Sequence, residues 1–169
     1  MRDRTDERLA ELADGAREVL EKLCMAGLQG PNNALADELI RPRPGDYQRV
    51  FIPAMAEALQ RAYEPFWIRR QMGPRPKPTQ SQVRLSIATT EDLRAGNDRA
   101  HPFPEGYQKV ARYFVPGRVW IRWKFVEPGA TMGMAYDGLV WIDDHWAWFP
   151  KPWKAVNMAR TMPPEPYEA

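Results

Sequence analysis

The stretch that decides the fold is Gly138-Leu-Val-Trp-Ile-Asp-Asp-His-Trp-Ala-Trp-Phe149. Two apolar runs rich in β-branched and aromatic residues flank the short polar sequence Asp143-Asp144-His145. A polar interruption this short between strand-forming runs is typical of a β-hairpin. We therefore predict two antiparallel strands joined by a turn at these three polar residues.

Further strands are predicted on the N-terminal side of this hairpin. Apolar residues alternate with other residues over 83–87 and again over 119–125, which is typical of half-buried strands. Another strand near residues 131–136 is expected to end in a bend at Asp137-Gly138. The sequence therefore predicts an antiparallel sheet within residues 81–153.

The first part of the chain predicts a layer of helices over residues 1–70. Apolar residues recur at spacings of three and four over 5–26, and a shorter pattern of this kind covers 32–40. Pro53 suits the first position of a third helix, and Pro65 is expected to kink or end that helix.

We expect one α+β domain over residues 1–169, in which N-terminal helices pack on a curved antiparallel sheet. A stiff proline-rich connector, residues 74–78, joins the helices to the sheet. Residues 107–114 fit a short helix, with a strand as the alternative. The segment 154–169 is expected to be a tail.

Composition excludes several classes of protein. Lys and Arg total 24 against 22 Asp and Glu, and this net charge of +2 is too small to indicate a nucleic-acid partner. No apolar run resembles a signal peptide or a membrane span, so a cytoplasmic location is expected, or export if the original N-terminus lay upstream of Met1. A single cysteine, Cys24, and two histidines make a metal site unexpected, and no cofactor is expected.

Asp143-Asp144-His145 is the most tempting cluster for chemistry. A carboxylate beside an imidazole could supply a general base or metal ligands. Neighbouring strand residues point to opposite faces, however, and the trio lies where the hairpin must turn. Turn formation explains the Asp-Asp pair without any chemistry.

Three other residues are candidate catalytic groups. Tyr136 and Asp137 could act as proton donor and base beside a carbonyl, although an Asp-Gly bend and a strand tyrosine are also ordinary structural residues. His101 lies in a long polar loop, where a solvated side chain is the plain interpretation and a lid over a pocket is the alternative.

The tryptophans suggest a binding surface. All of them except Trp67 lie between Trp120 and Trp153. Apolar residues occupy both faces of the predicted strands, so some rings are expected at a cavity or on the surface. The candidate binding residues for an apolar small molecule are the aromatic residues of these strands, namely Trp120, Trp123, Trp141 and Tyr136.

The hairpin from Val140 to Phe149, preceded by helices and a bent sheet, resembles the nuclear transport factor 2-like superfamily over residues 46–153. The ending Phe149-Pro-Lys-Pro-Trp153 is also similar to bacterial proteins of unknown function. The resemblance implies a cone-shaped, cystatin-like α+β fold with an apolar pocket. Some relatives are isomerases or dehydratases, and many only bind ligands or dimerise, so a homodimer through the sheet is expected. The enzymes place Asp, His or Tyr on cavity-facing strands, and no such set maps onto this sequence.

The leading hypothesis is a non-catalytic ligand-binding or accessory domain with an aromatic-lined pocket or sheet face. One alternative is an isomerase or hydro-lyase that uses Tyr136, Asp137 or His101. Another is a protein-interaction module that uses residues 74–78.

The hairpin also predicts a contrast in stability. Trp146 and Trp148 share one strand face and are expected to be more buried than Asp144 and His145. On this basis Trp148→Ala should cost about 3–5 kcal/mol and His145→Ala well under about 1 kcal/mol.

Overall fold

Four helices precede the sheet in the computed structural model, which describes residues 4–158. They are α1 (Arg4–Gln29), α2 (Asn33–Ile40), α3 (Asp46–Val50) and α4 (Pro53–Ile68). The rest of the chain forms β1 (Gln82–Thr89), α5 (Thr90–Ala95), α6 (Gly106–Val110), a 3-10 turn (Ala111–Tyr113), β2 (Val119–Val126), β3 (Gly133–Ile142), β4 (His145–Trp148) and α7 (Pro152–Met158). The α+β class predicted from the sequence is confirmed.

The four strands form one antiparallel sheet in the order β1-β2-β3-β4. The predicted hairpin is confirmed, because Trp141 pairs with Trp146 and the chain turns at Asp143-Asp144. Asp143 adopts a φ of 58°, in the left-handed region that aspartate tolerates in turns. His145 lies outside the turn, as the first residue of β4.

The bend predicted at Asp137-Gly138 is wrong, since β3 continues through both residues. Ile121 pairs with Leu139 and Arg122 with Asp137, so Gly138 is an extra residue that forms a β-bulge. Gly138 has a φ of 88°, and a Cβ there would collide with the carbonyl oxygen of Phe149. The bulge and this close approach account for the glycine.

Two further boundaries differ from the prediction. Pro65, which was expected to kink or end the third helix, lies inside α4, and the helix ends three residues later, at Ile68. Pro152 begins α7, so residues up to 158 of the predicted tail are helical and the remainder of that tail lies outside the described residues. Residues 106–113 form α6 and the 3-10 turn, which confirms the short helix predicted there over the strand alternative.

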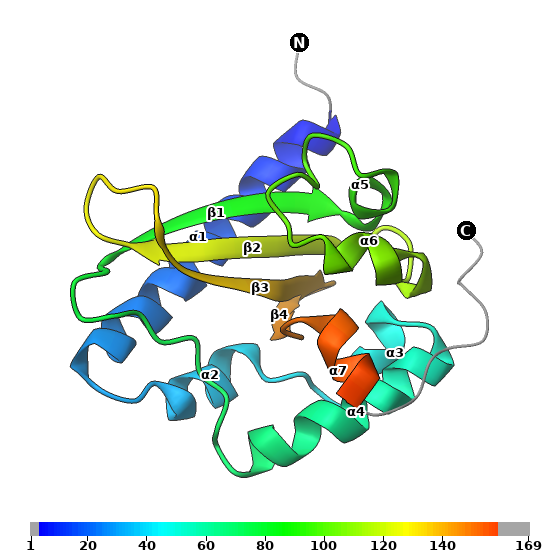
Figure 1. The fold of residues 1–169 in the computed structure, drawn as a ribbon, viewed down its shortest axis with the longest axis horizontal. Coiled ribbons are helices and arrows are strands. Elements are labelled where there is room, and N and C mark those ends of the chain that lie inside the picture. Colours follow the sequence, from blue (N-terminus) through cyan, green and yellow to red (C-terminus); the bar gives the residue numbers. More distant parts are fainter. Residues whose placement is uncertain (1–3, 159–169) are drawn as a thin grey trace.

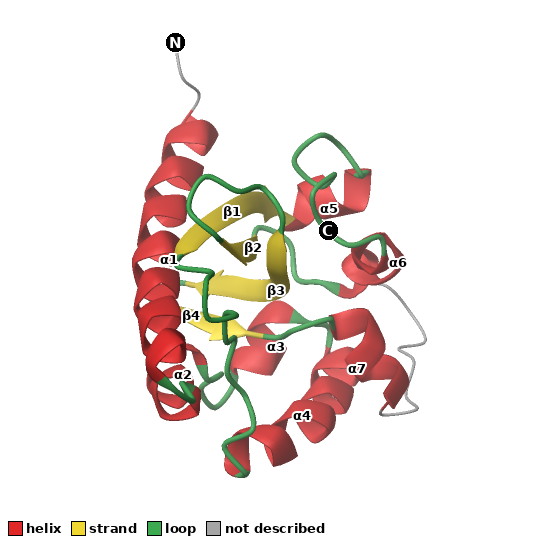
Figure 2. Ribbon diagram, turned by 60° about the vertical axis from the view of Figure 1, so that its left-hand side comes forward, coloured by secondary structure: helices red, strands yellow, loops and turns green. Residues whose placement is uncertain are grey.

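The two faces of the sheet are covered differently. Figure 2 shows α1 along one side of the sheet and α5 and α6 on the other. A Cβ added to Gly15 of α1 would lie 4.0 Å from Trp146, which places the face of Trp146 against α1. On the opposite face, Trp120 packs under the helices that follow β1, where it contacts Phe114 and Tyr107.

Candidate functional site

Two of the candidate binding rings, Trp120 and Trp123, are fully buried on opposite faces of β2. Trp120 stacks on Phe114 with ring centroids 4.3 Å apart, and its Nε1 donates a hydrogen bond to Thr90 Oγ1 at 3.2 Å. Trp123 stacks on Tyr136 at 5.5 Å. Neither indole reaches the surface, so both rings contribute to the core.

The other two rings are half-buried and lie on the face that packs against α1. Trp141 packs edge-on against Trp146 with centroids 5.1 Å apart. The Tyr136 hydroxyl donates a 2.7 Å hydrogen bond to the carbonyl oxygen of Arg75. Trp120 lies on the other face, so the structure does not gather the candidate rings around one cavity.

Asp137 precedes the bulge at Gly138 and lies on the sheet face of Trp120, where α6 covers it. Asp137 is 4% exposed, and its Oδ1 accepts hydrogen bonds from the Tyr107 hydroxyl at 2.6 Å and the Lys151 backbone N–H at 2.9 Å. Burial raises the pKa of Asp137, and these hydrogen bonds oppose the shift. Burial, followed by the charge of Asp137, raises the pKa of Tyr107 well above its ordinary value.

The three candidate catalytic residues do not converge. Tyr136 and Asp137 are neighbours on β3 and point to opposite faces, and the Tyr136 hydroxyl is bonded to the backbone of the connector. His101 is exposed in the loop after α5, where it lines a hollow of about 190 Å³ together with Tyr107. The partner of Asp137 is therefore Tyr107, the first residue of the short helix predicted over residues 107–114, which the sequence did not indicate as a candidate site residue.

A second polar cluster joins α3 to the hairpin. Asp46 is fully buried and accepts hydrogen bonds from the Arg43 N–H at 2.7 Å and Arg49 Nη1 at 3.0 Å. His145 Nε2 lies 2.8 Å from Asp46 Oδ2, and His145 Nδ1 lies 2.6 Å from Asp144 Oδ1. This network includes a hydrogen-bonding role for His145, which the turn interpretation had missed.

The hollow beside His145, about 610 Å³, contains balanced charges. Arg49 pairs with Asp46, and Arg43 Nη1 lies 3.6 Å from Asp144. The nearby Arg118 donates to Asp143 at 2.9 Å. Because each arginine faces a carboxylate, we interpret the cluster as a set of ion pairs and hydrogen bonds that holds α3 against the hairpin.

In one half of the sheet face that carries Trp120 the side chains are basic, and no helix of residues 4–158 covers them. The β2–β3 loop contacts this half at its far end, where the Gly129 N–H donates to Gln82 Oε1 at 3.3 Å. Figure 1 looks onto this face: α1 passes behind the sheet, and within residues 4–158 no helix crosses β1 and β2 on the side away from α5 and α6. Arg84 pairs with Lys124 and Ser86 pairs with Arg122, so the four side chains share this face. We call Arg84, Ser86, Arg122 and Lys124 the open basic face.

The cations of the open basic face have few partners. Within residues 4–158, neither Arg84 nor Arg122 makes a side-chain hydrogen bond or a salt bridge, and Lys124 Nζ reaches only the Thr131 carbonyl at 3.4 Å. Burial lowers the pKa of Arg122, and the charge of Asp137, its neighbour in register, opposes this shift. The face is therefore a concentration of positive charge without salt-bridge partners in the described chain.

The proline-rich connector packs against α1. Pro74 and Pro76 are buried, and the Pro74 carbonyl accepts a 3.0 Å hydrogen bond from Asn32 Nδ2. Arg75 Nε donates to the Gly27 carbonyl at 3.0 Å. Of the three prolines in residues 74–78, Pro78 alone is exposed.

No family model matches this chain. The searches of curated proteins and of solved structures find no match either. Across residues 4–158, no three His, Cys, Asp or Glu side chains are grouped so that they could hold a metal ion. In the same part of the chain, no helix is both long and apolar enough to cross a membrane.

Proposed function

We propose that this chain is a non-catalytic binding domain that holds an acidic partner on the open basic face. The observation that carries the proposal is the set of three cations, Arg84, Arg122 and Lys124, on a half-sheet that no helix of the described chain covers. Surfaces of opposite charge attract and orient their partners. Anionic groups such as carboxylates are the ligands that this face attracts.

The arrangement of the cations supports this proposal energetically. Arg84 and Lys124 stand directly opposite each other, and like charges in such a pair destabilise an antiparallel sheet. An apolar pair or an oppositely charged pair at these two positions would stabilise the isolated sheet more than two cations do. A bound carboxylate removes the repulsion, which is a benefit that the isolated domain lacks.

The other candidate sites favour binding over catalysis. Because Trp120 and Trp123 are buried, they support a binding site on the sheet face better than one in an aromatic-lined pocket. Asp137 is hydrogen-bonded within the core, and the polar groups predicted to work with it point elsewhere. A catalytic site needs such groups to converge on one reacting position.

The proposal is tested with the double variant Arg84→Glu/Lys124→Glu and a poly-glutamate probe. We expect the unmodified protein to bind the probe with an affinity that falls as salt rises, because surface charges are screened. The double variant should bind at least about tenfold more weakly. Lys22→Glu is the control for a charge reversal on another surface, since this exposed lysine lies on α1 and pairs with Glu18. Equal loss in the control, or no binding by the unmodified protein, would contradict the proposal.

A second candidate function is the isomerase or hydro-lyase, which the hollow shared by His101 and Tyr107 supports. Tyr107 connects this hollow to the buried Asp137 through its 2.6 Å hydrogen bond. Small hydroxy-carbonyl compounds can be screened by proton NMR for isomerisation or loss of water. Turnover that disappears in Tyr107→Phe, while the variant stays folded, would support this alternative; no turnover would exclude it for the compounds tested.

A further inference from the structure

The outer edge of β1 presents backbone groups that no other strand within residues 4–158 pairs. β1 is the first strand in the order β1-β2-β3-β4. The Thr90 N–H donates to the Arg118 carbonyl at 2.9 Å, one position beyond the pair Thr89↔Val119. Hydrogen-bonded pairs alternate along an antiparallel ladder, so the even-numbered residues of β1 bond to β2. The N–H and C=O groups of Val83, Leu85, Ile87 and Thr89 therefore point outward.

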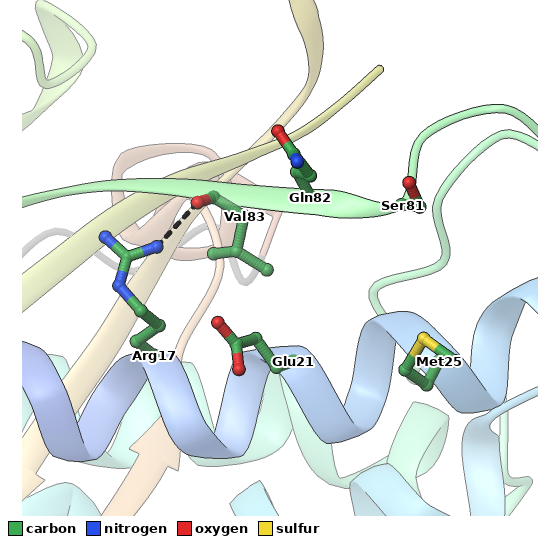
Figure 3. A pocket seen from close by; sticks show the side chains of 6 residues that line it. All are labelled: Arg17, Glu21, Met25, Ser81, Gln82 and Val83. Atoms are coloured by element: carbon green, nitrogen blue, oxygen red, sulfur yellow. Dashed lines mark hydrogen bonds between the residues drawn. The ribbon is translucent and has the colours of Figure 1, made fainter. Parts of the chain in front are cut away.

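Two side chains form hydrogen bonds with the outward backbone groups at the two ends of this edge, and its middle has no such partner among the described residues. Arg17 Nη1 of α1 donates to the Val83 carbonyl at 2.7 Å, as Figure 3 shows. At the other end, the Thr89 N–H donates to Asp92 Oδ2 at 3.0 Å. Between them, the peptide groups of Leu85 and Ile87 make no outward hydrogen bond to any residue of 4–158. An unpaired strand edge of this kind is a template for another strand.

We propose that the acidic partner binds as an extended segment that adds to this edge as a fifth strand. This inference rests on the proposed function and specifies how the partner is held. The segment pairs its backbone with the outward groups of Leu85 and Ile87, which are separated by about 6.7 Å along the strand. Strand addition gives the partner directed hydrogen bonds as well as charge attraction.

The two faces of β1 determine the sequence that the segment needs. Arg84 and Ser86 lie on the open basic face, whereas Leu85 and Ile87 are half-buried on the face of Trp123 and α1. Side chains of the added strand alternate in the same way. The partner segment therefore alternates acidic and apolar residues, with carboxylates on the side of Arg84.

A hollow continues the edge beyond Val83. It holds about 390 Å³ between α1 and the start of β1, where Arg17, Glu21 and Met25 line it (Figure 3). Met25 is 54% exposed and offers an apolar contact at the end of the hollow away from Arg17, with Glu21 between the two (Figure 3). The next residue of the added strand fits there, with Arg17 close to its backbone.

A second copy of this chain is a less suitable occupant. Antiparallel pairing of two β1 edges about a two-fold axis joins the same face of both sheets. The cations Arg84, Arg122 and Lys124 of the two copies would then share one continuous surface. Like charges gathered in this way repel each other, whereas an acidic strand neutralises them.

The test compares two short peptides of alternating glutamate and valine, bound to the full chain and measured by fluorescence anisotropy. One peptide is unmodified, and the other carries N-methyl groups on the backbone amides that would face β1. The charges are identical, but the second peptide cannot donate these hydrogen bonds. We expect N-methylation to weaken binding by about tenfold or more. The amides of Leu85 and Ile87 should also gain protection from hydrogen exchange when the unmodified peptide binds.

A variant tests the same edge from the protein side. Leu85→Pro removes the outward N–H without removing a bond to β2, and edge positions of this kind tolerate proline. It should bind the unmodified peptide more weakly than Leu85→Val, its matched control, while both variants give the same circular dichroism as the parent chain. If Leu85→Pro does not fold, the N-methylated peptide alone decides.

The outcomes separate this inference from the function on which it rests. If both peptides bind equally and Arg84→Glu/Lys124→Glu abolishes binding, the basic face binds acids and strand addition is overturned. In the absence of peptide, the Leu85 and Ile87 amides could be protected and the molecular mass could rise with protein concentration. This result would show that two copies pair through β1 and would overturn the proposal of an acidic strand. If neither peptide binds, both proposals fail.

Discussion

The two halves of one sheet face differ although they lie on the same strands. In the covered half, Trp120 packs against Phe114 and is fully buried. In the open half of the same strand, the positions on this face are occupied by Arg122 and Lys124, and no helix of the part of the chain that the structure describes lies over them. The comparison teaches that one strand can serve stability at one end and recognition at the other.

The largest expected effect on stability is in the covered half. Trp120→Ala removes a fully buried ring that stacks on Phe114 and donates to Thr90. It should lower the free energy of unfolding by about 3–5 kcal/mol, the range for truncating a core aromatic residue. Lys124→Ala in the open half is the matched control and should change stability by less than about 0.5 kcal/mol. If urea melts gave similar losses of unfolding free energy for Trp120→Ala and Lys124→Ala, the two halves would not differ in their contribution to stability.

His145→Ala is expected to have the next largest effect. The sequence indicated a turn residue and a cost well under about 1 kcal/mol, but His145 bonds to the fully buried Asp46. Truncation leaves part of a buried carboxylate without its partner, so we expect a loss of about 1–3 kcal/mol. Trp148→Ala, at about 3–5 kcal/mol, remains the costlier change in the hairpin. Urea melts of both variants check the order, and a neutral His145→Ala would show that the link to α3 adds nothing.

The burial contrast in the hairpin is confirmed. Trp146 and Trp148 are 6% and 4% exposed, whereas Asp144 is exposed and His145 is half-buried. The alternation of the strand predicts this order correctly. The cost of losing His145 was misjudged because its partner, Asp46, is 99 positions away in the chain.

Asp137 should give a pH-dependent effect at the boundary between the two halves. Burial raises its pKa, so the folded chain binds the proton more tightly than the unfolded chain does. The stability that this protonation contributes is fully present below the unfolded pKa of about 3.9 and is lost as pH rises through the raised folded pKa. Asp137→Asn does not titrate, and its Oδ1 can still accept from Tyr107.

The measurement for Asp137 is a series of urea melts from about pH 3 to about pH 7. Between the unfolded and folded pKa values of Asp137, the parent chain should lose stability relative to Asp137→Asn as pH rises. Asp98→Asn in the exposed loop is a control and should show no comparable trend. Parallel pH profiles for the parent chain and Asp137→Asn would contradict the raised pKa.

The smallest expected effect is in the open half. Arg84→Ala removes one of two like charges that stand opposite each other, so it should stabilise the chain slightly, by about 0.3 kcal/mol at low salt. The gain should disappear as salt screens the remaining charges. Thermal melts at low and high salt measure it. A clear loss of stability would mean that Arg84 contributes to the fold itself.

Local pattern was enough for most of the fold. The alternation of β2 and the Asp-Asp turn depend on neighbours in sequence, so the strands and the hairpin were predicted correctly. The bulge was missed because Asp137-Gly138 suits a turn and a bulge equally, and the choice depends on the distant carbonyl of Phe149. The resemblance to the nuclear transport factor 2-like superfamily remains a prediction.

The candidate site was harder to predict. The sequence shows Arg84, Arg122 and Lys124 only as the polar residues of half-buried strands. Whether such residues lie under a helix depends on where α5 and α6 pack, which no local pattern specifies. The pairing of Tyr107 with Asp137 likewise arises from tertiary contact between residues 30 positions apart.

The central claim, that the open half of the sheet holds an acidic partner, is tested most directly by a backbone-amide NMR titration of the full chain with the glutamate-valine peptide. We predict that the shifts of Arg84, Ser86, Arg122 and Lys124 change together at one affinity, and that Arg84→Glu/Lys124→Glu abolishes these changes. Shifts that leave these four residues unaffected, or that persist in the double variant, would contradict the claim.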